Sequence, residues 1–116
     1  MFNQVRTSKE NKEVVSIITT KLRLGAENVI ARIAIGYSIS KNKKLDINNV
    51  KDSSGKTYSY KILLGEYDRI YIAMICQLYD IHQSDPDLAK YIKLHLDDGL
   101  DQLAEEDYNS INQMFL

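Results

Sequence analysis

The chain of 116 residues has one cysteine, one proline, no tryptophan and no long apolar run. A single cysteine excludes a disulfide within the chain, and the apolar neighbours of Cys76 predict a buried, unreactive thiol. The longest clean apolar run, Ile70–Cys76, is far shorter than a membrane span. The first residues turn polar at once and lack the apolar core of a signal peptide, so we expect a cytoplasmic protein with no membrane contact.

Composition is ordinary for a folded protein. Hydrophobic residues make up 44% of the chain and charged residues 27%, which argues against disorder. No internal repeat or low-complexity tract is present. At this length we expect one domain spanning residues 1–116.

The net charge of −1 conceals a strong asymmetry. Residues 1–61 contain twelve Lys and Arg but five Asp and Glu, which leaves +7, whereas residues 62–116 contain three and eleven, which leaves −8. One interpretation is a basic half that faces a polyanion and an acidic half that faces elsewhere. The other is solvated helix faces with an accidental imbalance, and charge alone does not decide between them.

The first half of the chain predicts a short strand and two helices. Residues 2–7 look extended, and Thr7–Glu10 has the pattern of a capping box that opens a helix from about Ser8 to Leu24. Gly25 suits the left-handed residue that ends a helix. A second helix is expected over Ala26–Ser40, and its wide apolar stripe indicates burial on two sides, for instance by a second subunit.

The second half predicts three further helices. Residues 57–64 alternate enough for a short strand or extended segment. A third helix is expected over Glu66–His82, and a fourth over Asp85–Asp98, which opens with an Asp-Pro pair that suits an N-cap and a first helical residue. Gly99 should end or kink that helix before a last one over Leu100–Met114. The predicted fold class is mainly α, with about five helices and a short N-terminal extended segment.

Motifs for catalysis and cofactor binding are missing. Gly55–Thr57 has the sequence that ends a P-loop, but Val50 stands where the first glycine is required. The two histidines, His82 and His95, do not have the spacing of a zinc site. No nucleophile elbow and no recognisable Cys–His pair occurs. We therefore expect a protein that is not an enzyme and binds no metal and no cofactor.

Two tyrosines stand among lysines in the middle of the chain. Tyr58 and Tyr60 lie among Lys51, Lys56 and Lys61, and interleaved basic and aromatic side chains can bind single-stranded nucleic acid by stacking and phosphate contacts. Alternatively the tyrosines cover the core with their hydroxyls in water, which is the interpretation we favour.

The order of the first three elements is that of a ribbon-helix-helix unit. Such units pair through a β-ribbon, which can enter the major groove of DNA. The wide apolar stripe and the turn before it make Gly25, Ile33 and Tyr37 candidates for a subunit contact. Basic residues concentrate in this part of the chain and just after it, and the candidates for DNA contact are Arg6, Lys9, Lys12, Lys21, Arg23, Lys41, Lys43 and Lys44.

Two sequence blocks point to a family. The first is Arg6–Lys12 (RTSKENK) leading to Leu22–Ala34 (LRLGAENVIARIA), and the second, more specific block is Leu63–Asp68 (LLGEYD) at the start of the predicted third helix. Together they resemble DndE, the small component of the bacterial DNA phosphorothioation, or DNA sulfur modification, system. The resemblance spans nearly the whole chain and includes its length and the order of both blocks.

The resemblance implies a mainly helical protein with a ribbon-helix-helix-like element. It also implies that the chain is not itself a sulfur-transfer enzyme. It would work beside the cysteine desulfurase and the other Dnd proteins that replace a non-bridging phosphate oxygen with sulfur. The family is associated with tetramer formation and with binding to double-stranded DNA, notably nicked duplex, and supplies no catalytic residues to carry over.

Three hypotheses follow. The first is a non-catalytic DNA-binding subunit of the phosphorothioation machinery that acts as a homo-oligomer, namely a homotetramer. The second is a structural adaptor that docks the other Dnd proteins, with incidental affinity for DNA. The third is a repressor or antitoxin of the ribbon-helix-helix type, which would require specific operator binding.

Overall fold

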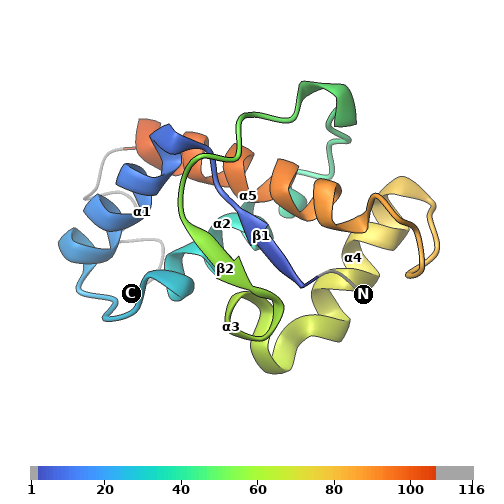
Figure 1. Ribbon diagram of the computed structural model, residues 1–116, viewed down its shortest axis with the longest axis horizontal. Coiled ribbons are helices and arrows are strands. Elements are labelled where there is room, and N and C mark those ends of the chain that lie inside the picture. The colour runs from blue at the N-terminus through green and yellow to red at the C-terminus, as the bar shows by residue number, and fades with distance from the viewer. Residues whose placement is uncertain (1–2, 107–116) are drawn as a thin grey trace.

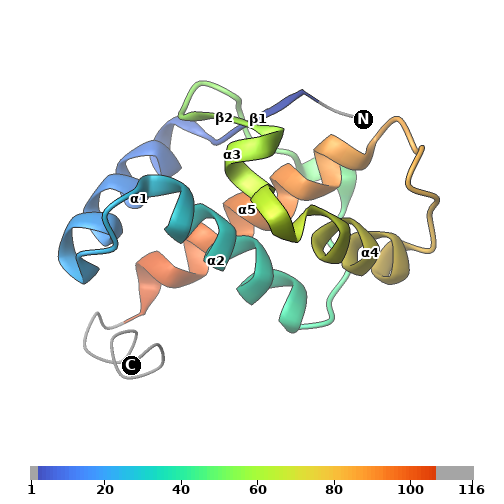
Figure 2. The same ribbon diagram turned by 90° about the horizontal axis from the view of Figure 1, so that it is seen from below.

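The computed structural model describes residues 3–106, which fold around one central helix. Figures 1 and 2 show this helix, α5, in the middle, with a two-stranded ribbon on one side and α2 on the other. In chain order the elements are β1 (Gln4–Arg6), α1 (Lys9–Leu22), α2 (Glu27–Ser40), the 3-10 turn Ile47–Asn49, β2 (Thr57–Ser59), α3 (Tyr60–Leu64), the 3-10 turn Gly65–Tyr67, α4 (Asp68–Tyr79) and α5 (Leu88–Glu105).

Burial shows how completely the middle of α5 is enclosed. Every residue from Ile92 to Asp97 is buried, including Lys93 and His95. A helix is buried on consecutive positions only when other elements cover it on all sides. The ribbon, α1, α2 and α4 supply that cover, with Ile30, Ile35 and other side chains of α2 fully buried against it. A mainly helical fold is therefore confirmed.

The first two predicted helices are present, with corrected ends. Ser8, not Thr7, caps α1, and its side chain accepts a hydrogen bond from the Asn11 amide. Arg23, with φ 54°, is the left-handed residue at the end of α1. Gly25 also has a left-handed backbone, with φ 85°, but it lies in the turn beyond the helix. The left-handed residue that ends α1 is therefore Arg23, two residues before the predicted Gly25.

The predicted break at Gly99 is wrong. One helix, α5, runs through that position from Leu88 to Glu105, so no separate helix begins at Leu100. Gly99 is there for packing, since a Cβ on it would lie 2.0 Å from the carbonyl oxygen of Ala34 in α2. The helix also begins three residues later than expected, because Asp85 accepts a hydrogen bond from the Asp87 amide in a turn before it. The remainder of the predicted Leu100–Met114 helix, beyond residue 106, lies outside the described residues.

The ribbon is formed within a single chain. β1 pairs antiparallel with β2, and Gln4, Val5 and Arg6 lie opposite Ser59, Tyr58 and Thr57. The extended segment predicted over residues 57–64 is thus a strand only to Ser59, because the Ser59 side chain then caps α3. A ribbon-helix-helix unit pairs its first strand with a second subunit, whereas here β2 of the same chain lies along β1. The structure does not confirm the ribbon-helix-helix element.

Candidate nucleic-acid interface

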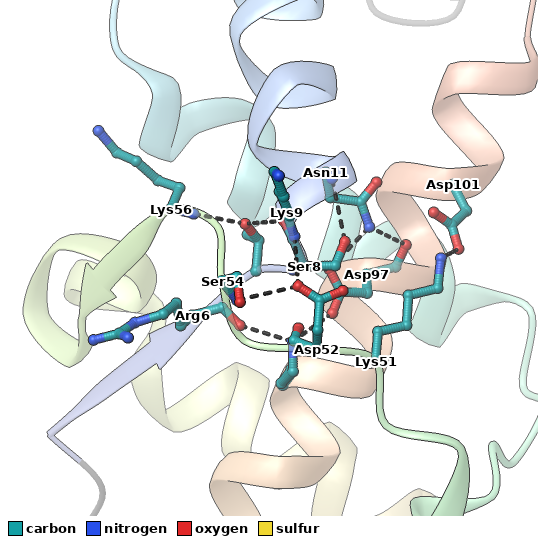
Figure 3. A network of polar contacts seen from close by, with 12 residues as sticks. Arg6, Ser8, Lys9, Asn11, Lys51, Asp52, Ser54, Lys56, Asp97 and Asp101 are labelled. Atoms are coloured by element: carbon teal, nitrogen blue, oxygen red, sulfur yellow. Dashed lines mark hydrogen bonds and ion pairs between the residues drawn. The ribbon is translucent and has the colours of Figure 1, made fainter.

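The ribbon, the start of α1 and the loop of residues 51–56 meet at one corner of the molecule, which we call the ribbon corner (Figure 3). Along β1 the side chains alternate, with Val5 buried and its neighbours Gln4 and Arg6 exposed. The guanidinium of Arg6 donates from Nε to the Thr57 hydroxyl at 2.9 Å. This hydrogen bond holds Arg6 on the outer face of the ribbon, where it can reach a ligand.

The backbone amides at the start of α1 are already occupied. The Ser8 amide donates to Oδ1 of Asp97 at 3.1 Å, and the Lys9 amide donates to Oδ2 of Asp52 at 2.9 Å. Carboxylates are favourable at a helix N-terminus because they satisfy its free N–H groups and its dipole. These amides are therefore not available for a phosphate, and any contact here must come from side chains.

The loop of residues 51–56 is bound tightly to the start of α1. Lys56 accepts from the Thr7 amide at 2.8 Å and donates its own amide to the Thr7 hydroxyl at 2.9 Å. Asp52 also accepts from the Ser54 amide, at 3.2 Å. The amides of Lys9 and Ser54 hold the pKa of Asp52 below its ordinary value, so this carboxylate stays ionised at neutral pH.

Several basic side chains of the ribbon corner are neutralised by carboxylates of the same chain. Lys51 forms an ion pair with Asp101, and Lys56 lies 3.4 Å from Glu27. Within residues 3–106, Arg6, Lys9 and Lys12 form no ion pair, and all three are exposed. The basic side chains of the ribbon corner that remain outside ion pairs are therefore Arg6 and the two lysines in the first turns of α1, where Glu10 and Glu13 also lie.

The other predicted DNA contacts lie elsewhere. Lys21 and Arg23 are at the far end of α1, about 20 Å from its start for a helix of this length. Lys43 and Lys44 follow α2, whose C-terminal end lies at the bottom of Figure 2 while the ribbon lies at the top. Lys41 places its ammonium 4.4 Å from the centre of the Tyr37 ring. The structure thus separates the eight candidates into three groups rather than one patch.

The three candidate subunit contacts differ in exposure. Gly25 is exposed, and no atom lies within 4 Å of the position that its Cβ would occupy. Ile33 and Tyr37 are half-buried and pack against the core on one side. These side chains retain free surface on α2, which keeps them available for a contact between copies.

The two tyrosines of the central segment belong to the body of the fold. Tyr58 is buried beneath the ribbon, and burial raises the pKa of its hydroxyl well above the ordinary value. Tyr60 donates its hydroxyl to Asp68 at 2.7 Å, and partial burial together with this carboxylate raises its pKa to about 12. The buried ring of Tyr58 cannot stack on a base, which supports the interpretation that it covers the core.

A second polar cluster, which the sequence did not reveal, surrounds His95. Its Nδ1 lies 2.8 Å from the Ser38 hydroxyl and its Nε2 lies 2.7 Å from the Tyr79 hydroxyl. Ser38 donates to Asp98 at 2.6 Å, and Tyr79 accepts from the Leu45 amide at 2.9 Å. All these contacts are satisfied by a neutral ring that carries its proton on Nδ1. The serine and histidine are buried, so they form a structural network and not an accessible nucleophile.

His95 predicts a pH dependence of stability. Burial lowers the pKa of this ring below the ordinary value, and the opposing effect of the Asp98 carboxylate is smaller. Below about pH 6.5 the His95 ring therefore binds a proton in the unfolded chain more readily than in the folded protein. Because protonation favours the unfolded chain, the free energy of unfolding falls as pH drops below about 6.5. We expect the melting temperature to fall between pH 7 and pH 5, and His95→Gln to weaken that dependence. The exposed His82→Gln is the control, and an equal effect of both substitutions would contradict the prediction.

Within residues 3–106, no helix combines the length and apolar character that crossing a membrane requires. The same described part of the chain contains no group of three or more His, Cys, Asp or Glu side chains placed to hold a metal ion.

Sequence reasoning missed the residues that organise the ribbon corner from below, namely Lys93, Asp97, Asp52 and Asn11. A signal for two of them was present. Lys93 and Asp97 are four residues apart in a stretch where Ile92, Leu96 and Leu100 mark an apolar helix face. Two opposite charges four residues apart beside such a face are a candidate for an ion pair against the core. Asp52 gave no comparable signal for its bond to α1, because the Lys9 amide that it accepts from is 43 residues away in sequence.

Comparisons with known proteins agree with the resemblance noted in the sequence. The crystal structure of DndE from Escherichia coli B7A, described as involved in DNA phosphorothioation modification, is similar with a TM-score of 0.70 and 18% identity, covering 89% of this chain and 98% of that one. A crystal structure of a DndE mutant with lysine in place of glycine, described as involved in DNA phosphorothioation, gives 0.71 and 21%, with the same coverage. At these identities the two structures establish a shared fold. No curated protein sequence matches.

The sequence family described as DNA sulphur modification protein DndE matches residues 4–110. That range includes both sequence blocks, the whole ribbon corner and all of α5. Because the match extends over nearly the whole chain, the protein belongs to the DndE family, which is involved in DNA phosphorothioation.

Proposed function

We propose that this protein is a non-catalytic component of the DNA phosphorothioation system that binds duplex DNA, nicked duplex in particular, as a homotetramer. The observation that carries the proposal is a group of exposed basic side chains at the ribbon corner that form no ion pair within residues 3–106, namely Arg6, Lys9 and Lys12. Phosphate contacts from such side chains give affinity without sequence information. A protein that recognises a nick needs this kind of backbone contact more than it needs base reading.

Oligomerisation strengthens the proposal on electrostatic grounds. One chain has a net charge of −1 and three separated basic groups, so a single copy is a modest binder of DNA. Four copies would present each group four times, and linked contacts multiply overall affinity. Gly25→Lys tests the contact, because open space surrounds Gly25 within the chain. We expect sedimentation to shift toward smaller species, and an unchanged mass would place the contact elsewhere.

The absence of catalysis remains part of the proposal. The serine–histidine pair is closed to solvent and fully hydrogen-bonded, which supports a structural role for it. Chemistry would then be supplied by the other Dnd proteins, which are the expected protein partners. A sulfur-transfer activity of the purified chain alone would contradict this part of the proposal.

The direct test is sedimentation of the protein with intact, nicked and single-stranded DNA at two salt concentrations. We expect the nicked duplex to bind most tightly and every affinity to fall as salt rises. Binding that does not depend on salt, or no binding at all, would contradict the proposal.

Charge reversal at the ribbon corner should weaken binding without unfolding the protein. Lys9→Glu and Lys12→Glu each remove a phosphate contact, which lowers the slope of log affinity against log salt by about 0.9 per contact. We expect roughly tenfold weaker binding at moderate salt for each variant. Lys90→Glu is the control, since Lys90 is an exposed residue of α5 paired with Asp87. The same titration of Lys21→Glu and Lys43→Glu assigns the other two basic groups.

A specific observation also favours the adaptor alternative. Ile62, Tyr67 and Ile70 are more than half exposed, at 57%, 51% and 58%. Arg32 connects two of them, because it donates to the Ile62 carbonyl at 3.1 Å and lies 5.6 Å from the centre of the Tyr67 ring. Co-purification of other Dnd proteins that survives nuclease treatment, with charge-reversal variants still active in cells, would favour docking. The repressor alternative has no such support, because the ribbon is completed within the chain.

A further inference from the structure

The ammonium group of Lys93 lies buried beneath the ribbon corner. Lys93 is 6% exposed, and its Nζ donates three hydrogen bonds. Two go to backbone carbonyls, that of Arg6 at 2.8 Å and that of Asp52 at 2.9 Å, and the third goes to Oδ2 of Asp97 at 2.8 Å. An ammonium has three N–H donors, so every one is used.

Asp97 completes the arrangement from the same helix. It is 3% exposed, and its Oδ1 accepts from the Ser8 amide at 3.1 Å and from the Asn11 side-chain amide at 2.9 Å. The two side chains of α5 therefore hold three separate segments, β1, the start of α1 and the loop of residues 51–56. Lys93 binds the backbone carbonyl of Arg6 itself, and Asp97 binds the backbone amide of Ser8, which is next to Lys9 in sequence.

The attraction between two buried charges is by itself weak evidence for a stabilising role. Burying two charges loses their hydration, and replacing a buried ion pair with apolar side chains of similar size is often neutral or stabilising. What apolar side chains cannot do is fix two carbonyls and an amide at defined points, because hydrophobic contact has no direction. Fixed donors and acceptors set the relative positions of three segments that meet only here.

We propose that Lys93 and Asp97 are positioning residues for DNA binding: they hold the basic side chains of the ribbon corner in the arrangement that matches neighbouring phosphates. This inference rests on the proposed function. Neither residue can touch DNA, since both lie under the backbone that they hold. Their effect passes through Arg6 and Lys9, the exposed residues above them.

The main test is the double variant Lys93→Met/Asp97→Leu. It leaves the net charge unchanged, so a loss of affinity cannot arise from a loss of positive charge. We expect a folded protein that binds nicked duplex roughly tenfold more weakly, with a salt slope lower by about 2 if two phosphate contacts are lost. Lys90→Met/Asp87→Asn is the matched control, because it removes an exposed pair of the same charges from the start of the same helix. The control should bind as the unmodified protein does.

Asp97→Asn gives a second test in which electrostatics and geometry predict opposite signs. The substitution makes the net charge more positive by one, which by itself would strengthen DNA binding. Loss of the anchor for Lys93 should instead weaken it, by several-fold, at a temperature where circular dichroism shows the variant folded. Tighter or unchanged binding by Asp97→Asn, or unchanged affinity and salt slope of the double variant, would overturn the inference.

Each remaining outcome is also decisive. If both variants fail to fold, the pair is required for the fold itself and a separate positioning role is rejected. If the unmodified protein does not bind DNA, the proposed function fails before any variant is compared. Salt-dependent binding by the unmodified protein together with equal binding by a folded double variant rejects only the inference about Lys93 and Asp97.

Discussion

Gly99→Ala should destabilise the protein by about 3 kcal/mol, which is a large share of the stability of a chain of this size. The added Cβ would lie 2.0 Å from the Ala34 carbonyl oxygen and 2.5 Å from its carbonyl carbon, and both belong to the backbone of α2. The backbone of α2 cannot avoid the added Cβ by a change of rotamer, as a side chain could. The two helices must separate, and the contact around Ile30, Ile35 and Leu96 loosens with them.

The sign of this effect is opposite to the one that helix propensity gives. Alanine is a better helix former than glycine by roughly 1 kcal/mol, so propensity alone would stabilise α5. Gly36→Ala in α2 is the matched control, because its Cβ would meet only the Tyr71 side chain at an ordinary 3.6 Å. We expect Gly36→Ala to raise the melting temperature slightly and Gly99→Ala to lower it by about 15 °C. Similar melting temperatures for the two variants would contradict the packing argument.

Gly99 also shows why the sequence predicted a helix break that the structure does not have. Glycine ends helices when its backbone is left-handed, and glycine permits close approach when its backbone is helical. The sequence of α5 contains nothing that distinguishes these roles, since the partner is Ala34 on a helix some sixty residues earlier. The first helix was predictable because its signals are local, namely the polar residues Thr7 and Ser8 before it and the apolar period of α1, although the cap is Ser8 and not Thr7.

The charge asymmetry was a sound observation with an incomplete interpretation. The fold brings parts of the two halves together, because Lys51 from the basic half forms an ion pair with Asp101 from the acidic half. This pair cancels one charge of each half, whereas Lys56 pairs with Glu27 inside the basic half and Lys93 pairs with Asp97 inside the acidic half. Which basic side chains remain without an ion pair depends on which carboxylates fold against the other lysines. A pairing over 50 residues, such as that of Lys51 with Asp101, leaves no pattern in a single sequence.

Gly55→Ala is expected to damage the fold and the ribbon corner together. A Cβ at this position would lie 2.1 Å from the Ser8 carbonyl oxygen and 2.3 Å from the Thr7 hydroxyl oxygen. The loop of residues 51–56 would have to move away from α1, and the bond from the Gly55 amide to the Thr7 carbonyl, now 3.0 Å, would break. We expect a loss of about 3 kcal/mol in unfolding free energy, measured by chemical denaturation.

Gly25→Ala separates close packing from backbone strain, and so shows what the Gly55 result means. At Gly25 the backbone is left-handed but the surroundings are empty, so alanine should cost only about 1 kcal/mol of strain. At Gly55 the cost arises from the close approach of three segments, and Asp52 would lose its hold on the Lys9 amide as the loop moves. The Gly55→Ala variant should therefore also bind nicked duplex several-fold more weakly at temperatures where it is folded, whereas folded Gly25→Ala should bind normally as the same assembly. Equal stability of Gly55→Ala and Gly25→Ala would mean that the loop of residues 51–56 can move away from α1 at little cost in free energy. The hydrogen bonds of the ribbon corner would then not hold the loop in a fixed position.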